Sequence, residues 1–194
     1  MRPFFCAFGL LLALVAAPAL AHQPVLAPLG DHGSQSPIAV KDPEVSKAYF
    51  GQLTGKSAYY RIVSAEPFRF YAGITAPKID NCPLTTRFSF DVLDGDMKLV
   101  AAADGESFAW WPWYENFGKK WYWVGPEIGA KFKSTRTLPA GTYTIRVFNA
   151  ENSGRYVLAV GDEESFPLDV IVKTMLILPG INRDFWDSAD CSAR

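Results

Sequence analysis

The residue types most able to do chemistry gather in one stretch, from Asp104 to Glu127. The stretch holds nine aromatic residues, and five of the chain's six tryptophans are among them. Aromatic rings offer apolar faces on which sugars stack, and they also dominate protein interfaces. We therefore expect a surface that contacts a glycan or an envelope protein, with the candidate residues Trp110, Trp111, Trp113, Tyr114, Trp121 and Trp123.

A structural interpretation of the same stretch stands beside this one. The rings would fold back and fill one end of the protein, with Phe108/Trp110 and Trp121/Trp123 as cross-strand pairs. A long connection inside a compact domain is usually functional or disordered, and the aromatic content argues against disorder. Burial of most rings is favoured over a wholly exposed platform, and a mixed outcome leaves two or three rings exposed.

The two histidines, His22 and His32, are the candidate metal ligands. If a leader is cleaved after Ala21, His22 becomes the first residue, and its α-amine and imidazole would chelate a divalent metal, above all Cu(II). His32 and the adjacent Asp31 would add ligands, although both histidines lie on a proline-rich segment that holds little fixed geometry. A periplasmic copper-binding protein is thus the alternative function, and no other cofactor is expected.

The first twenty-one residues have the pattern of a secretory signal peptide. Arg2 supplies the positive charge, Phe4 to Val15 forms an apolar run too short for a membrane span, and Ala19 to Ala21 forms the cleavage site. The mature chain then keeps Cys82 and Cys191, and an even pair in an oxidising compartment predicts a disulfide. We expect a periplasmic or secreted protein.

Enzyme motifs are absent, and a non-catalytic role is favoured. The pair Glu115 and Glu127 is the one carboxylate arrangement considered for glycoside hydrolysis, because that reaction needs two acids beside an aromatic cleft. The chain has 19 basic and 20 acidic side chains, which excludes a polybasic nucleic-acid binder. The acidic residues around Gly95 and those from Asp162 to Glu164 fit a hairpin turn and a helix start better than a calcium loop.

The elements that must position these residues are mostly strands. Polar and apolar residues alternate from Phe88 to Val92 and from Tyr143 to Val147, and turn residues such as Asp94-Gly95-Asp96 separate the segments. The pattern predicts an all-β fold, an antiparallel, jelly-roll-like β-sandwich. The expected strands are 48–53, 58–63, 68–74, 87–92, 98–102, 131–138, 143–149 and 155–160.

Segments of a different character flank the predicted sandwich. Four prolines between residues 22 and 44 predict an extended arm, the sandwich domain spans 45–161, and residues 162–194 form a helix and tail. The helix is expected at 166–178, with Ser165 as N-cap and Pro179-Gly180 as its end. It would dock on the sandwich, or alternatively lie on a membrane surface.

Residues 138–160 carry a family resemblance. The segments LPAGTYTIRV, from Leu138, and GRYVLAV, from Gly154, resemble the closing hairpin of bacterial pre-peptidase C-terminal domains, which commonly run "aGtYtv.V… sG.Y.L.V". The resemblance implies a jelly-roll-like, non-catalytic accessory module of exported proteins. It transfers no functional residues.

Overall fold

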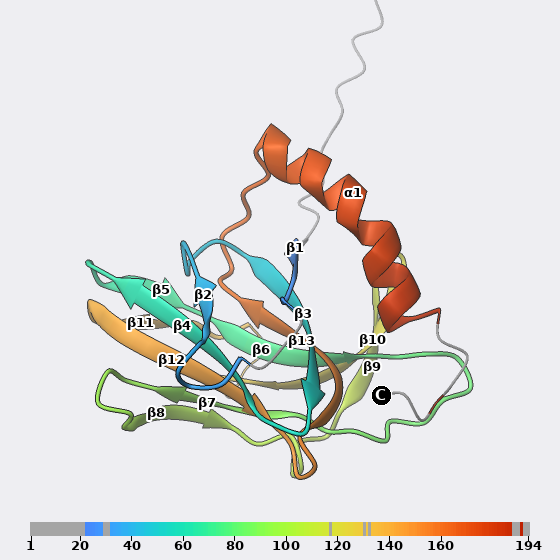
Figure 1. Ribbon diagram of the computed structural model, residues 1–194, viewed down its shortest axis with the longest axis horizontal. Coiled ribbons are helices and arrows are strands. Elements are labelled where there is room, and N and C mark those ends of the chain that lie inside the picture. The colour runs from blue at the N-terminus through green and yellow to red at the C-terminus, as the bar shows by residue number, and fades with distance from the viewer. Residues whose placement is uncertain are drawn as a thin grey trace, which may run out of the picture.

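The protein is a β-sandwich with one helix near the C-terminus, as the sequence predicts (Figure 1). The computed structural model describes residues 22–28, 32–116, 118–129, 131, 133–187 and 191. The predicted signal peptide, residues 1–21, and Asp31 lie outside the described residues. The strands are β1 (Gln23–Leu26), β2 (Ile38–Val40), β3 (Lys47–Thr54), β4 (Ala58–Ser64), β5 (Phe68–Phe70), β6 (Ala72–Pro77), β7 (Ser89–Leu93), β8 (Leu99–Ala103), β9 (Trp111–Glu115), β10 (Lys120–Glu127), β11 (Arg136–Leu138), β12 (Gly141–Phe148) and β13 (Ser153–Val160).

Two larger sheets form the layers. One has the strand order β1-β3-β13-β6-β10-β9, the other has β2-β4-β12-β7-β8, and β11 pairs with β5 in a small third sheet. Most neighbours are antiparallel, as expected, but β1 lies parallel to β3 and β2 lies parallel to β4. The arm predicted at 22–44 therefore adds a short parallel edge strand to each large sheet.

Strict alternation of side chains builds the core between the sheets. Phe88, Phe90 and Val92 point inward and are fully buried, and so are Ile145 and Val147 on the neighbouring strand β12. The alternation seen in the sequence thus identifies the inward face of both strands. The turn at Asp94-Gly95-Asp96 joins β7 to β8, where the sequence places a hairpin.

The helix α1 spans Leu168–Phe185, seven residues beyond the predicted end at 178. Pro179 lies inside the helix and does not end it, and the N-cap residue is Pro167 without a side-chain cap hydrogen bond, not Ser165. The prediction of the helix end is wrong because Ile181 and Phe185 are buried beyond the proline. Their packing outweighs the backbone hydrogen bond that proline cannot donate.

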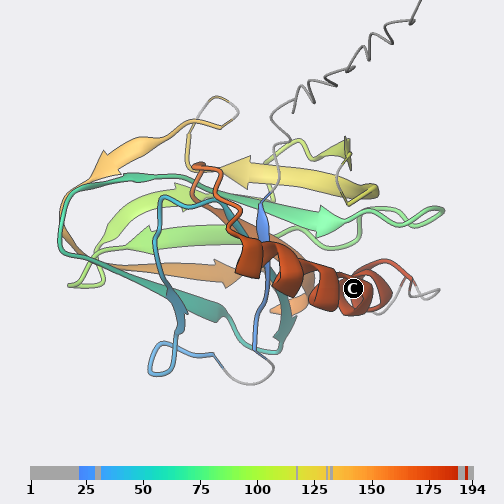
Figure 2. The same ribbon diagram turned by 90° about the horizontal axis from the view of Figure 1, so that it is seen from above.

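The C-terminal half of α1 covers the outer face of the six-stranded sheet, while its N-terminal half stands clear of the sheets (Figures 1 and 2). Phe50 of β3 and Val157 of β13 are buried there against Ile181, Phe185 and Trp186. This second cluster is separate from the main core. None of the described helices is long and apolar enough to cross a membrane.

Candidate binding surface

The aromatic stretch forms a hairpin of regular strands and not an irregular loop. β9 and β10 pair antiparallel, with Tyr114 opposite Trp121 and Trp113 opposite Tyr122. Aromatic side chains favour the pleated backbone, and their cross-strand contacts stabilise the pair. The predicted pair of Trp121 with Trp123 is wrong as a cross-strand contact, because both residues lie on β10 and project from the same face.

One face of this hairpin carries a cluster that we call the aromatic ledge: Lys78, Tyr114, Trp121 and Trp123. The rings of Tyr114 and Trp121 lie 5.2 Å apart at 54° to each other. The Lys78 ammonium lies 5.5 Å from the Trp121 ring and 5.6 Å from the Trp123 ring. These distances are in the range of cation–π attraction, which holds the lysine over the two indoles.

The ledge is open to solvent at its outer end. Trp121 is 41% exposed and Tyr114 is 37% exposed, whereas Trp123 is partly buried against the main core. The Trp121 backbone carbonyl accepts a hydrogen bond of 2.9 Å from the Trp186 indole. The backbone that carries the exposed Trp121 ring is therefore hydrogen-bonded to the residue at the C-terminal end of α1.

The opposite face of the hairpin lies toward α1. Trp113 and Tyr122 contact each other there and line a cavity of about 100 Å³ between α1 and the sheet. The cavity walls are largely apolar, and His22, Glu115 and Lys120 are among its polar lining residues. Burial raises the pKa of the Tyr122 hydroxyl, so this ring stays neutral.

Trp110 has a structural position. Its indole donates a 2.8 Å hydrogen bond to the Gly105 carbonyl, and its ring packs over Gly125, where an added Cβ would lie only 2.4 Å from the ring. Trp111 is 38% exposed on the strand at the sheet edge. Across the described part of the stretch, three rings are exposed and the remainder are partly buried, which is the mixed outcome.

The two candidate metal ligands lie in different places. His22 lines the cavity under α1 and a second one of about 150 Å³ shared with Tyr71, Asp162 and Glu164. Partial burial, with a contribution from Lys133, lowers the pKa of His22 to about 4. His32 lines a separate cavity of about 430 Å³, and its Nε2 lies 2.8 Å from the Pro28 carbonyl oxygen.

The structure therefore does not bring the two histidines together in one cavity. Among the described residues, no group of three or more His, Cys, Asp and Glu side chains is placed to hold a metal ion. The amine and imidazole of His22 remain as the candidate copper ligands.

The carboxylates of Glu115 and Glu127 do not form a catalytic pair. Glu115 lies opposite Lys120, at the other end of β10 from Glu127. Seven residues of extended strand separate these ends by roughly 20 Å, against about 5 to 10 Å for the acids of a glycosidase. Tyr71 donates a 2.9 Å hydrogen bond to Glu127, whose pKa is raised by burial.

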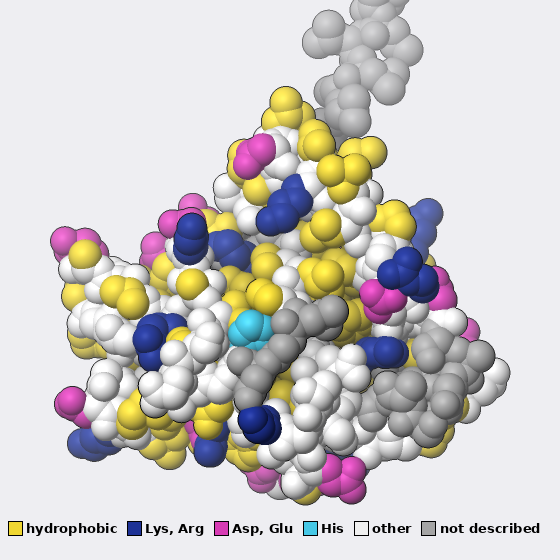
Figure 3. Space-filling model, viewed as in Figure 1, with side chains coloured by type: hydrophobic (Ala, Val, Ile, Leu, Met, Phe, Trp, Pro, Cys, Tyr) yellow, Lys and Arg dark blue, Asp and Glu magenta, His cyan; other side chains and the backbone are white. Residues whose placement is uncertain are grey.

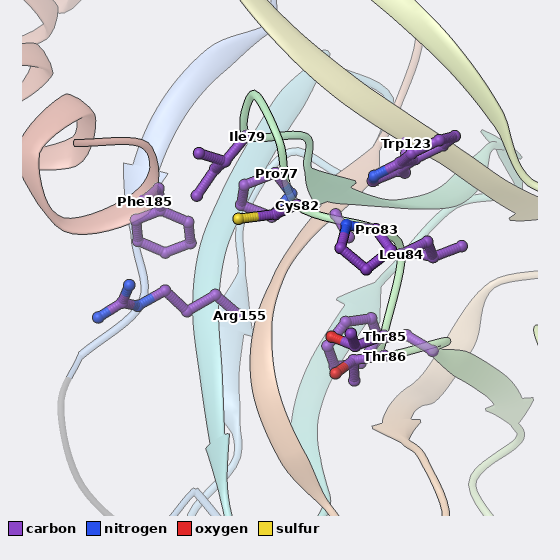
Figure 4. Close-up of a pocket in the computed structure, with 12 residues that line it drawn as sticks. Pro77, Ile79, Cys82, Pro83, Leu84, Thr85, Thr86, Trp123, Arg155 and Phe185 are labelled. Atoms are coloured by element: carbon purple, nitrogen blue, oxygen red, sulfur yellow. The ribbon is translucent and has the colours of Figure 1, made fainter. Parts of the chain in front are cut away.

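The predicted disulfide between Cys82 and Cys191 is present, with their Cα atoms 5.7 Å apart. Figure 4 shows Cys82 in a small pocket between Phe185 and Arg155 on one side and Trp123 on the other. The pocket volume is about 20 Å³, enough for about one water molecule. The disulfide thus joins the C-terminal tail to the segment between β6 and β7.

Two polar residues of this region had no signal in the sequence. Lys78 belongs to the ledge because β6 ends beside β10, a pairing of distant segments that spacing does not reveal. Arg155 lies between the Figure 4 pocket and the 430 Å³ cavity, and its buried Nη1 has no hydrogen-bond partner in the part of the chain that the structure describes.

Comparison with known proteins identifies no family. Neither a protein-family model nor a curated protein matches the chain. A solved β-glucosidase from Paenibacillus barengoltzii is similar over 74% of this chain and 14% of its own length, with 11% identity and a TM-score of 0.26. This chain thus spans about a seventh of that enzyme, and so distant a likeness carries no argument. The pre-peptidase C-terminal resemblance of residues 138–160 stays a prediction.

Proposed function

We propose that this protein is an exported, non-catalytic binding module of the cell envelope that recognises a protein partner through the aromatic ledge. The observation that supports it best is the pair Tyr114 and Trp121, exposed yet fixed in register on adjacent strands. Large apolar rings lose little conformational entropy when a partner covers them, and such residues dominate binding energies at interfaces.

The geometry of the rings favours a protein over a glycan. A sugar platform needs rings that share a plane, whereas Tyr114 and Trp121 are inclined at 54°. The two rings contact each other, so an apolar side chain of a partner would pack on their exposed edges. Lys78, which forms no ion pair with any described residue, would attract a carboxylate beside that side chain.

Site-specific photo-cross-linking in the source organism tests this proposal. A photoreactive residue at position 121 should give one discrete protein adduct, and the same residue at position 63, an exposed valine on β4, should give none. Lys78→Ala and Tyr114→Ala should each weaken the adduct at position 121. A glycan array supplies the opposite outcome, because glycan binding that is lost in Trp121→Ala would replace the protein partner.

Export is the second part of the proposal. The disulfide fits an oxidising compartment, since such bonds are rare in the cytosol. Mass spectrometry of the exported protein should give a chain that begins at His22. A cytosolic protein that retains residues 1–21 would contradict both the cleavage site and the periplasmic or secreted location.

Copper binding at His22 is the second candidate function. The lowered pKa keeps its imidazole unprotonated at neutral pH, as a metal ligand must be. Cu(II) titrated into exported protein should bind tightly, and His22→Ala should abolish the site. Unchanged binding after that substitution would remove the proposal.

A further inference from the structure

The N-terminal half of α1 exposes large apolar side chains to solvent. Leu168, Met175 and Leu176 are 76%, 70% and 76% exposed, and Ile171 and Val172 are 43% and 51% exposed. Figure 3 shows hydrophobic side chains gathered where α1 stands above the sheets. We call these five residues the apolar stripe.

The apolar stripe is not the face that holds the helix on the sheet. At about 100° per residue, the stripe and Pro179 cover an arc of about 140°, centred about 130° away from Thr174, Ile181 and Phe185. Those three residues are the buried ones of the helix. The helix therefore has two apolar faces, and the sandwich uses only one.

The width of the stripe indicates what covers it. The stripe is wider than the a/d seam of a coiled coil, so it needs a broad apolar surface to cover it. Only Asp169 and Lys173 carry charge in the segment from Leu168 to Leu178, and their charges cancel. The stripe therefore suits the boundary of a lipid bilayer and depends little on the lipid's charge.

The N-terminal end of α1 also lacks the capping and packing that stabilise a helix end in water. The N-cap Pro167 provides no side-chain hydrogen bond, and the first turn buries none of its residues. A helix end without caps or packing is marginal alone, and an apolar phase along one side stabilises it.

The place where the leader joins the fold points to the same phase. β1 begins at Gln23 and packs beside α1, at the edge of the six-stranded sheet. The apolar run Phe4–Val15 precedes β1 in the sequence, so before cleavage the membrane-directed segment is joined to the strand that packs beside α1.

From these observations we propose that α1 docks the protein on a lipid bilayer, with the apolar stripe lying in the interfacial region. The module then sits on a membrane surface with its helix parallel to that surface. This proposal is independent of the aromatic ledge, because the ledge lies on the face of the β9–β10 hairpin that points away from α1.

Co-sedimentation of exported protein with phosphatidylcholine vesicles tests the docking. Mass spectrometry first establishes the N-terminus, so that every variant compared has the same one. The wild-type protein should sediment with the vesicles, and Leu168→Gln with Leu176→Gln should lower the partition coefficient at least about tenfold. The matched control is Met97→Gln with Leu99→Gln, which removes two side chains that are 53% and 57% exposed on the other sheet. Partitioning of this control should equal wild type.

Further arms distinguish the alternatives. Vesicles containing phosphatidylglycerol should bind within about twofold of phosphatidylcholine vesicles, with little effect of salt, because the stripe carries no net charge. No sedimentation of wild type, or equal sedimentation of the α1 variant, overturns the proposal. A dimer in lipid-free buffer that the α1 variant abolishes would instead assign the stripe to a second copy. Circular dichroism should show that both double variants remain folded, since all four side chains are exposed.

Discussion

At the scale of single residues, the main core contains a polar contact between two tyrosines that the apolar side chains around it must accommodate. The hydroxyls of Tyr60 and Tyr156 lie 2.8 Å apart, and both residues are at most 1% exposed. Burial raises the pKa of both hydroxyls, so both stay neutral. Residue 51 lies against the Tyr156 ring and must be glycine, because any Cβ there would come within 2.5 Å of that ring.

The two tyrosines should behave as one unit in a double-mutant cycle. Tyr60→Phe leaves the Tyr156 hydroxyl buried without its partner, which should cost about 1 to 3 kcal/mol in the free energy of unfolding. Tyr156→Phe should cost a similar amount. The double variant removes both hydroxyls and should cost less than the sum of the two, as measured by urea unfolding. Additive losses would show that each hydroxyl has another partner.

His22 should make stability depend on pH. Its pKa is about 4 in the folded protein and about 6.5 when unfolded, so the unfolded chain binds a proton more readily. Its contribution is fully present above pH 6.5 and is lost as the pH falls toward 4. Between about pH 7 and pH 5, wild type should lose about 1 to 2 kcal/mol more than His22→Gln.

The measurement is urea unfolding of exported protein at the two pH values. His32→Gln is the control for removing a histidine elsewhere, and its pH dependence should match wild type. Equal losses in wild type and His22→Gln would show that the His22 ring is solvated.

At the scale of elements, alternation in the sequence predicts strands such as β7 and β12, which bury one face, but it misses β10 and starts the strand β11 too early, at 131 and not at Arg136. Phe88 to Val92 alternates because only one side of β7 meets the core. The strand β9 is not predicted from the sequence. Trp111 and Trp113 lie on one of its faces and Tyr114 lies on the other, so polar and apolar residues do not alternate. Pro112 also suggests a break, although proline is tolerated on an edge strand such as β9. The arm strands β1 and β2 are too short for a periodic signal.

The candidate surface was predictable only in part. The sequence identifies the aromatic residues, but exposure depends on the sheet face, which separates Trp121 from Trp110. Lys78 reaches the ledge through the pairing of β6 with β10, and such long-range pairing leaves no local pattern.

The course of α1 through Pro179 leads to a prediction at the same scale. Pro179 is exposed, so its replacement loses no packing, while alanine restores a backbone donor in the helix interior. Pro179→Ala should raise the free energy of unfolding by about 1 to 3 kcal/mol, measured in urea.

Gly180→Ala is the companion variant, since the space around Gly180 is open, and it should add about 0.5 to 1 kcal/mol. A loss of stability in Pro179→Ala would indicate that the proline sets a bend needed to seat Ile181 and Phe185.

At the scale of the whole molecule, two separate apolar clusters stabilise the fold. The main core joins the two large sheets, and the second cluster holds α1 on the outer face through Phe50, Ile181 and Phe185. The second cluster is small. In it Phe50 packs edge-on against Phe185, with the two ring centroids 5.2 Å apart. A helix with so few buried residues depends on further restraint, and the chain supplies it covalently beyond Trp186.

That restraint is the disulfide, whose cysteines are 109 residues apart. Closing so long a loop restricts the unfolded chain, and the chain-entropy model gives about 4 to 5 kcal/mol. Cys82→Ala with Cys191→Ala should therefore lower the free energy of unfolding by up to this amount in urea.

The double variant should also unfold in two steps, with α1 leaving the sheet before the sandwich opens, because the second cluster is separate from the main core. Circular dichroism at a helix wavelength and tryptophan fluorescence would then give different midpoints. Coincident midpoints with a full loss of stability would instead mean that helix and sandwich form one cooperative unit, and that the disulfide acts on the unfolded chain alone.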